Sequence, residues 1–368
     1  MSAPSRTVDE QELLTAAREG SEDAFRQLVE RHQRELHAHC YRMLGSVHDA
    51  EDAIQEALLR AWRGLPRFEG RSSLRSWLYK IATNTCLDAV ARRPKRVLPV
   101  EYAPSDPHQG PGEPIVESVW IEPYPDERLG VEDGYAAPEA RYEQRESIEL
   151  AFVAALQHLP ANQRAVLILR EVLGYSAKEV ADTLDTTVAS VNSALQRARA
   201  TVEDRLPEQS QQQTLRALGD DGLREVVGRY VDAWDRGDVD TVVEMLTEDA
   251  SFSMPPLRTW FAGRQAIRIF LAGWPLSGLW QWRHTSVRAN GQAALAFYAW
   301  DPEQRTHLPF ALNVLTLRGD RISDVTAFIA RAADDPDRRV IARLPEQPYD
   351  ALRMAAAFER FELPKQLD

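Results

Sequence analysis

The stretch from Asp49 to Arg96 reads DAEDAIQEALLRAWRGLPRFEGRSSLRSWLYKIATNTCLDAVARRPKR and decides the fold of the N-terminal third of this 368-residue chain. Its first part predicts an amphipathic helix that ends at Gly64-Leu65-Pro66, because apolar and charged residues recur with a helical period on opposite sides. The apolar stripe comprises Ala50, Ile54, Ala57, Leu58, Ala61 and Leu65. The charged stripe comprises Asp49, Asp52, Glu56, Arg60 and Arg63.

The second part of the stretch is a basic helix with aromatic residues. Between positions 58 and 97 there are ten Lys or Arg and two acids, a local net charge of +8 in a chain of net charge −12. Cations that neutralise phosphates, beside rings that accept unstacked bases, favour single-stranded nucleic acid as a partner. The alternative is a solvated basic helix whose Trp77 and Tyr79 are buried in a helical core.

Two motifs in this stretch, DAEDAIQE (Asp49 to Glu56) and RFEGRSSLRSWLYKIATN (Arg67 to Asn84), resemble region 2 of the extracytoplasmic-function class of bacterial RNA polymerase sigma factors. The resemblance implies that the acidic helix binds the clamp helices of the largest polymerase subunit, and that the loop from Phe68 to Ser73 captures a base flipped out of the minus-ten element. Capturing an extruded base costs only the few kcal/mol of unstacking. The implied polymerase contacts are Asp49, Asp52, Gln55 and Glu56. The minus-ten contacts that we expect are Phe68, Arg71, Ser72, Ser73, Trp77, Tyr79, Lys80 and Asn84.

Composition limits the class of protein. A length of 368 residues favours several domains, and no apolar run is long enough for a membrane span or a signal core, so we expect a cytoplasmic protein without a membrane partner. Cys40 and Cys86 lack metal or disulfide spacing and predict reduced, buried thiols. The cluster His32, His37, His39 and Cys40 lacks a second ligand pair, so we expect no metal and no cofactor.

From Leu98 to Leu150 the chain changes character, with thirteen acids, three arginines and many prolines. As far as about Pro138 this segment holds too little apolar surface to fold by itself, which predicts an extended linker. A plain solvated tether and an acidic mimic of RNA charge are both compatible with this composition.

Residues 176 to 202 predict a helix-turn-helix, with a capping box at Ser176 and Glu179 and a turn at Asp185-Thr186. We expect the second helix to pack through Val188, Val191, Ala194, Leu195, Ala198 and Val202. The residues expected to reach base edges in a major groove are Ser190, Asn192, Ser193, Gln196 and Arg197. The segment resembles sigma region 4, which reads the minus-thirty-five element; a plain helical hairpin is the alternative. Asn192 and Ala194 replace the basic residues of the commoner pattern, so we expect weak DNA binding by this domain alone.

The C-terminal part predicts helices followed by an antiparallel sheet, an α+β unit with tight turns at Asn290-Gly291 and Gly319-Asp320. Element order and the segment Arg236 to Phe252 resemble the SnoaL-like cone, whose enzymes use a buried acid or base. The candidates for such a role are His284, Asp301 and His307. We expect Asp301 to be exposed in a turn and the histidines to be core residues. Nine aromatic residues between Trp260 and Trp300 suit an apolar pocket, a docking surface or an ordinary core.

The predicted fold is multidomain, with two all-α sigma domains (a region 2 helical bundle and a region 4 helix-turn-helix) and an α+β SnoaL-like cone. The predicted boundaries are 8–97 for region 2, 98–138 for the acidic linker, 139–206 for region 4, 207–219 for a second linker, 220–332 for the cone and 333–368 for a tail. The helix-like segment Tyr349 to Phe361 in that tail is expected to return to the sigma domains.

The predicted function is that of a sigma factor that binds core RNA polymerase and promoter DNA, performs no catalysis, and is self-regulated by its C-terminal domain. An anti-sigma factor or a small-molecule ligand of that domain is a further expected partner. The alternative is a polymerase-independent DNA-binding regulator with a ligand-sensing or enzymatic SnoaL-like domain.

Overall fold

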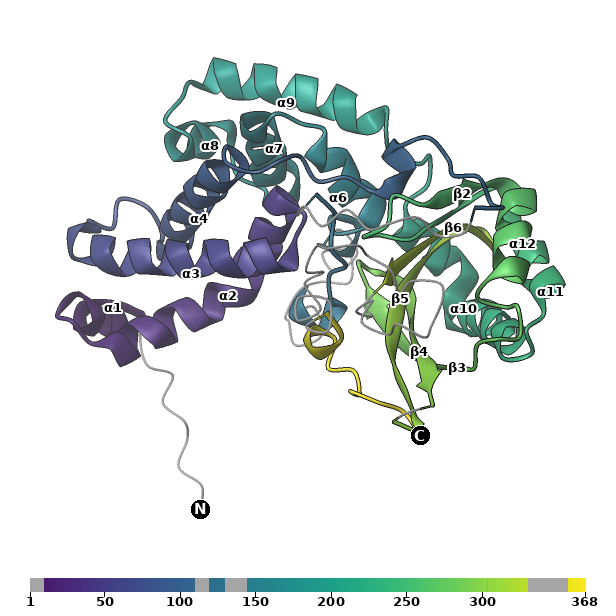
Figure 1. Ribbon diagram of the computed structural model, residues 1–368. Helices are drawn as coiled ribbons and strands as arrows, with labels where there is room; N and C mark the ends of the chain where they lie inside the picture. The colour runs from purple at the N-terminus through teal and green to yellow at the C-terminus, as the bar shows by residue number, and fades with distance from the viewer. Residues whose placement is uncertain (1–9, 110–118, 130–143, 303, 330–356) are drawn as a thin grey trace. The chain divides into compact units, whose positions relative to one another are not determined.

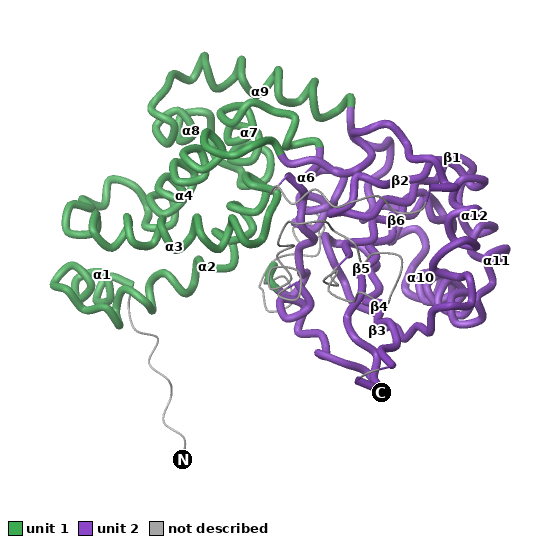
Figure 2. Tube along the Cα trace, in the orientation of Figure 1, with its two compact units in different colours: residues 1–95, 128–134, 155–204 green, residues 96–127, 135–154, 205–368 purple. Residues whose placement is uncertain are grey.

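The computed structural model describes residues 10–109, 119–129, 144–302, 304–329 and 357–368. The chain divides into two compact units, which Figure 2 distinguishes by colour. Unit 1 comprises residues 1–95, 128–134 and 155–204, and unit 2 comprises residues 96–127, 135–154 and 205–368.

The described residues of unit 1 form helices joined by short turns (Figure 1). Small hydroxyl residues begin these helices: Ser21, Ser46 and Ser73 each accept a hydrogen bond from a backbone N–H in the first turn. The elements are α1 (Glu10–Arg18), α2 (Glu22–Leu44), α3 (Val47–Gly64), η1 (Leu65–Arg67), α4 (Leu74–Val90), α6 (Leu150–Gln157, at the boundary between the units), α7 (Ala161–Leu167), the π-helical turn η4 (Ile168–Val172), α8 (Ala177–Thr183) and α9 (Val188–Glu203).

The predicted apolar stripe of α3 forms part of the core of unit 1. Five of its six members are buried, and Leu58 is half-buried. Cys40 and Cys86 are free, buried thiols, as expected. The amphipathic pattern therefore identifies the packed side of α3 correctly.

Unit 2 is built on one mixed six-stranded sheet with the strand order β2-β1-β6-β5-β4-β3. Its strands are β1 (Leu246–Ser253), β2 (Trp260–Ala262), β3 (Trp282–Ala289), β4 (Gln292–Asp301), β5 (Thr306–Arg318) and β6 (Arg321–Ile329). All neighbours are antiparallel except β1 and β6, which pair in parallel. The expectation of a wholly antiparallel sheet is therefore wrong at this pair. Parallel strands need a long crossover connection, and here the chain between β1 and β6 supplies it.

The sheet is covered by α10 (Gln211–Asp235), α11 (Val239–Glu244) and α12 (Gly263–Gly273). The α10 helix packs against β3, β4 and β5, and α12 packs against β1 and β2 (Figure 1). Aromatic side chains fill the space between helices and sheet; Trp234 of α10 lies 4.8 Å from Phe297 of β4, centroid to centroid. The unit is α+β, as the order of predicted elements indicated.

The glutamine-rich run begins α10, so the predicted linker 207–219 includes a helical segment. Gln211 donates its side-chain amide to the carbonyl of Leu317 and accepts from the Leu317 N–H, both at 2.8 Å, as a neighbouring strand would. Gln212 donates to the Gly291 carbonyl at 2.7 Å. The helix then changes direction at Gly219, whose φ of 67° suits glycine.

Residues 98–109 and 119–127 of the acidic linker belong to unit 2, and residues 128 and 129 belong to unit 1. Ile121 and Tyr124 are buried, the Tyr124 N–H donates to Asn290 Oδ1 at 2.8 Å, and Asp126 accepts from the Gly291 N–H at 2.7 Å. A solvated tether is therefore wrong for residues 119–127, because two large apolar side chains give this segment surface to bury. Residues 110–118 and 130–138 of the predicted linker lie outside the described residues.

The end of the chain also packs on unit 2. The ring of Phe358 lies 5.3 Å from that of Tyr298, and the Tyr298 hydroxyl donates to the Pro364 carbonyl at 2.9 Å. His307 and Leu367 exchange backbone hydrogen bonds of 2.8 and 2.9 Å. Residues 357–361 thus contact the sheet of unit 2, contrary to the expected return to the sigma domains, and the rest of Tyr349 to Phe361 lies outside the described residues.

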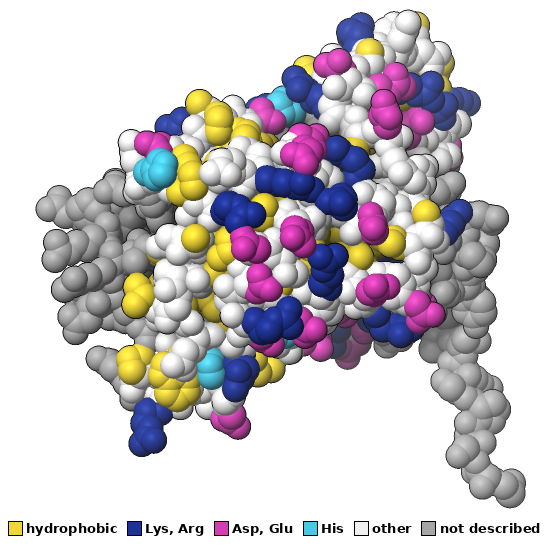
Figure 3. All heavy atoms as spheres, turned by 90° about the vertical axis from the view of Figure 1, so that its right-hand side faces the viewer, with side chains coloured by type: hydrophobic (Ala, Val, Ile, Leu, Met, Phe, Trp, Pro, Cys, Tyr) yellow, Lys and Arg dark blue, Asp and Glu magenta, His cyan; other side chains and the backbone are white. Residues whose placement is uncertain are grey.

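One face of unit 2, formed around α10, α11 and α12, carries acidic and basic side chains side by side (Figure 3). Arg264 pairs with Glu248, and Arg268 pairs with Asp240. Such interspersed charges lack the continuous positive field that attracts nucleic acid. In the part of the chain that the structure describes, no helix has the length and apolarity needed to cross a bilayer.

Glu149 binds the start of α10, and the raised pKa of its carboxyl group predicts that the stability of unit 2 depends on pH. Its buried carboxylate accepts from the N–H groups of Gln211 and Gln212 at 3.0 and 2.8 Å, and burial raises its pKa to about 7 from the usual 4.5. A pKa raised by folding contributes stability that is complete below pH 4.5 and is lost as the pH rises through 7.

We expect the free energy of unfolding of unit 2 to fall by about 3 kcal/mol between pH 5 and pH 8. Denaturant titrations at several pH values, followed by tryptophan fluorescence, measure it. Glu149→Gln should flatten this pH dependence. An unfolding free energy that rises over this pH range in the native chain would contradict the prediction.

Candidate polymerase and nucleic-acid interfaces

The acidic side of α3 exposes three of the four predicted polymerase contacts. Asp52, Gln55 and Glu56 are exposed, and Glu56 makes an i,i+4 ion pair of 2.8 Å with Arg60. Asp49 differs, because its carboxylate is buried and paired with Arg93. The surface that α3 offers to a partner is therefore the row Asp52, Gln55 and Glu56, here called the acidic row.

The loop before α4 is held by an aromatic pair. The rings of Phe68 and Trp77 lie 4.8 Å apart, and Arg18 donates to the Phe68 carbonyl and lies over the Phe68 ring. Phe68 is buried, Arg71 and Ser72 are exposed, and Ser73 is exposed and caps α4 by accepting from the Ser76 N–H at 3.1 Å. The loop therefore exposes the polar residues Arg71, Ser72 and Ser73, and the contact between Phe68 and Trp77 holds it in place.

Tyr79 lies inside unit 1. Its ring is buried between the Arg75 guanidinium, 4.8 Å from the ring centroid, and the ring of Tyr175 at 5.9 Å. Arg75 also pairs with Glu35 at 2.8 Å. Burial opposes ionisation of Glu35, but hydrogen bonds from His32 and Arg75 hold its pKa below the usual value. For Tyr79 the buried alternative therefore describes this structure.

Lys80 is engaged by the turn of the helix-turn-helix. Its Nζ donates to the Asp182 carbonyl at 2.7 Å and to Asp185 Oδ1 at 2.8 Å. Together with the contact of Tyr79 and Tyr175, this covers part of the α4 surface that was predicted to face the minus-ten DNA. We call these interactions of Tyr79 and Lys80 with Tyr175, Asp182 and Asp185 the closed contact. Trp77 and Asn84 are half-buried.

A buried arginine ties region 2 to the start of the helix-turn-helix domain. Arg164 of α7 donates to the Met43 carbonyl, to Gln157 Oε1 at 2.7 Å, and to the Gln157 and Leu159 carbonyls at 3.2 Å each. Burial lowers its pKa to about 10, so the guanidinium stays charged at neutral pH. An isolated buried charge is costly, and these four acceptors offset that cost.

The predicted helix-turn-helix is present, with local signals that the sequence contains. Ser176 and Glu179 form the reciprocal capping box, and Thr187 caps α9. The predicted base readers Ser190, Asn192, Ser193, Gln196 and Arg197 are all exposed on α9. The opposite side packs through Val191, Leu195, Ala198 and Val202.

Val188 departs from the predicted packing side. It is 43% exposed at the first turn of α9, and Ala194 is only half-buried. Periodicity alone placed Val188 with the core residues, but the described part of the chain leaves this side chain uncovered at the first turn of α9. The N-terminal residues of a recognition helix are the ones that enter the major groove, so this methyl-bearing side chain joins the candidate reading surface.

The candidate catalytic residues of unit 2 lie outside the sheet's inner cavity. That cavity has a volume of about 20 Å³ and is lined mainly by aromatic and aliphatic side chains, with Asn313 as a polar member. His284 Nδ1 is 3.3 Å from Asp235, and His307 is buried on β5. Asp301 was expected to be exposed but is buried, since it accepts from the Gln304 N–H at 3.0 Å within the turn after β4.

The histidine cluster of α2 serves the packing of unit 1. His32 contacts Glu35 at 2.6 Å, and His39 contacts the Thr83 hydroxyl at 2.9 Å. Burial lowers the pKa of His39 to about 3, so it is neutral. Within the described ranges, no three His, Cys, Asp or Glu side chains are grouped as metal ligands.

Comparisons with known proteins match three parts of the chain. The family model of Sigma-70 region 2 matches residues 28–96, and that of Sigma-70 region 4 matches residues 149–202. The model of the SnoaL-like domain matches residues 227–325. The ECF RNA polymerase sigma factor SigG of Mycobacterium tuberculosis is 45% identical over 305 residues, which cover 82% of this chain and 80% of SigG.

Two further proteins are similar over different lengths. The ECF RNA polymerase sigma factor SigW of Bacillus subtilis is 29% identical over 52% of this chain and 94% of its own length. The crystal structure of the Mycobacterium tuberculosis extracytoplasmic function sigma factor SigJ covers 84% of this chain and 97% of its own, with a TM-score of 0.51 and 21% identity. The last similarity concerns the fold alone.

Proposed function

Because the chain belongs to the extracytoplasmic-function class of RNA polymerase sigma factors, we propose that it binds core RNA polymerase in the cytoplasm, directs it to specific promoters and initiates transcription there. The observation that carries this proposal is that one compact unit exposes both an acidic row on α3 and a polar reading surface on α9. A polymerase-independent regulator would use only the second of these surfaces.

Run-off transcription with core polymerase and the purified full-length chain tests this function. Promoter-dependent transcripts that require the added chain are expected. DNA binding without any stimulation of core polymerase would support the polymerase-independent alternative instead.

We assign the upstream reading to α9. Ser190, Asn192, Ser193, Gln196 and Arg197 can hydrogen-bond base edges of the minus-thirty-five element, since all five are exposed on one helix. Val188 adds an apolar group, and the apolar partner that a major groove offers is the methyl group of thymine.

The minus-ten reading needs a change in unit 1. Tyr79 and Lys80 belong to the predicted minus-ten surface, and the closed contact occupies both of them. We propose that the closed contact is the resting form and that it opens when polymerase and promoter are bound. The Lys80 ion pair is exposed, so it contributes at most about 1 kcal/mol and is easily exchanged for a phosphate.

Self-regulation by the C-terminal domain is supported by how unit 2 holds the chain on both sides of region 4. Asn290 donates to the Ile148 carbonyl at 2.7 Å, and Gln292 accepts from the Leu150 N–H at 3.0 Å, at the start of the region 4 match. Gln212, just after it, donates to the Gly291 carbonyl. We propose that the β3–β4 turn at Asn290-Gly291 restrains the helix-turn-helix and so limits opening of the closed contact.

Loosening the turn should therefore raise transcription. Asn290→Gly keeps the positive φ that the turn needs (55° at Asn290) but removes the side chain that binds Tyr124 and Ile148. We expect several-fold more transcript at unchanged start sites in the run-off assay. Asp320→Gly, in the exposed β5–β6 turn, is the matched control. Unchanged output from Asn290→Gly, in a folded protein, would refute self-regulation through this turn.

We further infer that the inner cavity of the C-terminal domain is not a catalytic site. Its inner cavity of about 20 Å³ has room for about one water molecule, which is too little for an organic substrate. His284, Asp301 and His307 do not line that cavity. Replacing His284 and His307 together by Asn should leave transcription by the folded protein within twofold of the native level.

A further inference from the structure

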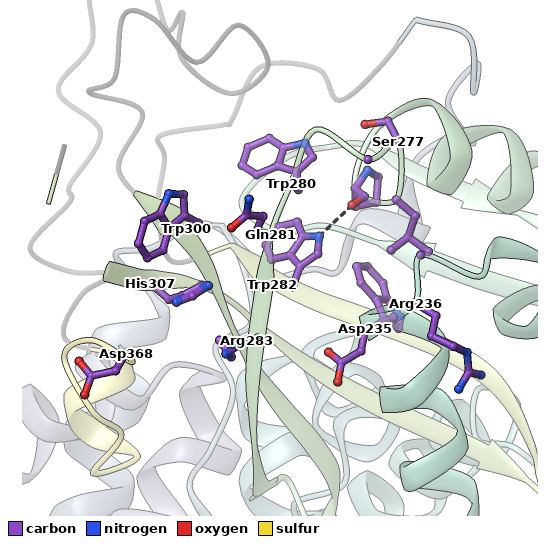
Figure 4. A pocket seen from close by; sticks show the side chains of 15 residues that line it. Asp235, Arg236, Ser277, Trp280, Gln281, Trp282, Arg283, Trp300, His307 and Asp368 are labelled. Atoms are coloured by element: carbon purple, nitrogen blue, oxygen red, sulfur yellow. Dashed lines mark hydrogen bonds between the residues drawn. The ribbon is translucent and has the colours of Figure 1, made fainter. Parts of the chain in front are cut away.

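Unit 2 has a second, much larger pocket, which shares the lining residues Trp234, Pro275 and Trp282 with the inner cavity. Its volume is about 740 Å³, and it opens between the end of α10, the loop before β3 and the neighbouring ends of β4 and β5 (Figure 4). Side chains from four tryptophans line it, namely Trp234, Trp280, Trp282 and Trp300. Small-molecule sites combine such apolar walls with a few polar groups that fix orientation.

The tryptophans provide flat faces. The indoles of Trp280 and Trp282 are stacked, with centroids 5.3 Å apart and planes at 15°. Trp282 is buried and its indole N–H donates to the Pro275 carbonyl at 2.8 Å, so the inner ring is fixed. Trp280 is only half-buried and Leu279 beside it is 86% exposed, which leaves the outer indole accessible to a planar ligand.

The polar groups of the pocket offer both donors and acceptors. His307 is 4% exposed, and its Nδ1 has no hydrogen-bond partner among the described residues. Its ring lies against Trp300, with centroids 5.1 Å apart, and Figure 4 shows it between Trp300 and Arg283 in the pocket wall. Burial lowers the pKa of His307, so the neutral ring can donate or accept according to its tautomer.

The charges of the pocket are balanced. Arg236 and Arg283 are exposed cations of its lining, and Asp235 and Asp368 are its carboxylates. An anion would meet two carboxylates and a cation would meet two guanidinium groups. A neutral molecule with hydrogen-bonding edges avoids both repulsions and can hydrogen-bond polar side chains of the lining, which include Ser277, Gln281 and His307.

We propose that this pocket binds an uncharged, planar heteroaromatic molecule with hydrogen-bonding edges, of about the size of a nucleoside, which stacks on Trp280 and hydrogen-bonds His307. The site lies on unit 2 alone and does not depend on the transcription function proposed above. Stacking of a base on an aromatic side chain contributes enough affinity that its removal is measurable.

Titration of the full-length chain with adenosine, adenosine monophosphate and ribose tests the proposal, with tryptophan fluorescence and calorimetry as readouts. We expect saturable adenosine binding in the micromolar to millimolar range, weaker binding of the charged monophosphate, and no binding of ribose, which lacks the planar ring. Absence of adenosine binding, or stronger binding of ribose or the monophosphate, would overturn the proposal.

Variants locate the site. Trp280→Ala should weaken adenosine binding about tenfold or more, and His307→Phe, which keeps a ring against Trp300, should weaken it less. Trp260→Ala, another half-buried tryptophan of unit 2 outside this pocket, should change binding less than twofold. Equal losses in Trp260→Ala and Trp280→Ala would place binding elsewhere and refute the assignment.

Discussion

Reversing two charges of the acidic row, in the variant Asp52→Lys with Glu56→Lys, should weaken association with core RNA polymerase by about 100-fold, because complementary charges at an interface become repulsive. Both residues are exposed, and Arg60 retains Asp88 as an ion-pair partner at 2.9 Å when Glu56 is replaced. The fold should therefore be preserved. Fluorescence anisotropy of the labelled chain titrated with core enzyme measures the affinity.

Two controls separate docking from folding. Asp23→Lys with Glu30→Lys reverses the same number of exposed charges on α2 and should leave the affinity within about threefold of the native value. Asp49→Asn should lower the melting temperature instead, because it removes the buried negative charge that pairs with Arg93. Native affinity in the acidic-row variant would remove α3 from the polymerase interface.

Replacing Arg164 by Leu should destabilise unit 1 by about 3–5 kcal/mol. The substitution leaves the Met43, Gln157 and Leu159 acceptors buried without their donor, and each unsatisfied buried group costs about 1–3 kcal/mol. Because Arg164 of α7 binds the end of α2, both helices should lose stability.

Urea denaturation followed by circular dichroism measures the loss, and amide hydrogen exchange of α2 and α7 locates it. Arg199→Leu serves as the control, since Arg199 makes one exposed ion pair of 2.7 Å with Glu171 and should contribute less than about 1 kcal/mol. A loss below 1 kcal/mol in Arg164→Leu would show that region 2 and the helix-turn-helix domain do not share a core.

Local patterns predicted those elements whose stabilising contacts are local. The capping box of Ser176 and Glu179, three residues apart, predicted the start of α8. The predicted turn at Asn290-Gly291 lies between β3 and β4 in the structure. The stripe of α3 was buried as expected. In each case the relevant neighbours are close in sequence, or the periodicity alone decides which side is packed.

Several of the errors concern contacts between residues far apart in sequence. Tyr124 and Asn290, 166 positions apart, dock the acidic linker on unit 2, and composition alone gave no sign of it. The ion pair with Arg93 buried Asp49, although its place on the charged stripe predicted a surface residue. The closed contact likewise depends on Lys80 and Asp185, separated by 105 positions. An acidic residue in a helix-turn-helix turn was the one available signal for it.

The closed contact can be held shut to ask whether it must open. In the double variant Lys80→Cys with Asp185→Cys, a short bismaleimide that joins the two new thiols would keep α4 and the helix-turn-helix turn together. The native Cys40 and Cys86 are buried and therefore react poorly with the reagent. The matched control is the same double variant with both cysteines capped by a monofunctional maleimide.

Run-off transcription with core polymerase compares the two proteins on one promoter. We expect the cross-linked protein to give at least tenfold less transcript than the capped control, because the minus-ten surface of α4 stays covered. Equal transcription from both proteins would contradict the account, since promoter reading would then proceed with the closed contact intact.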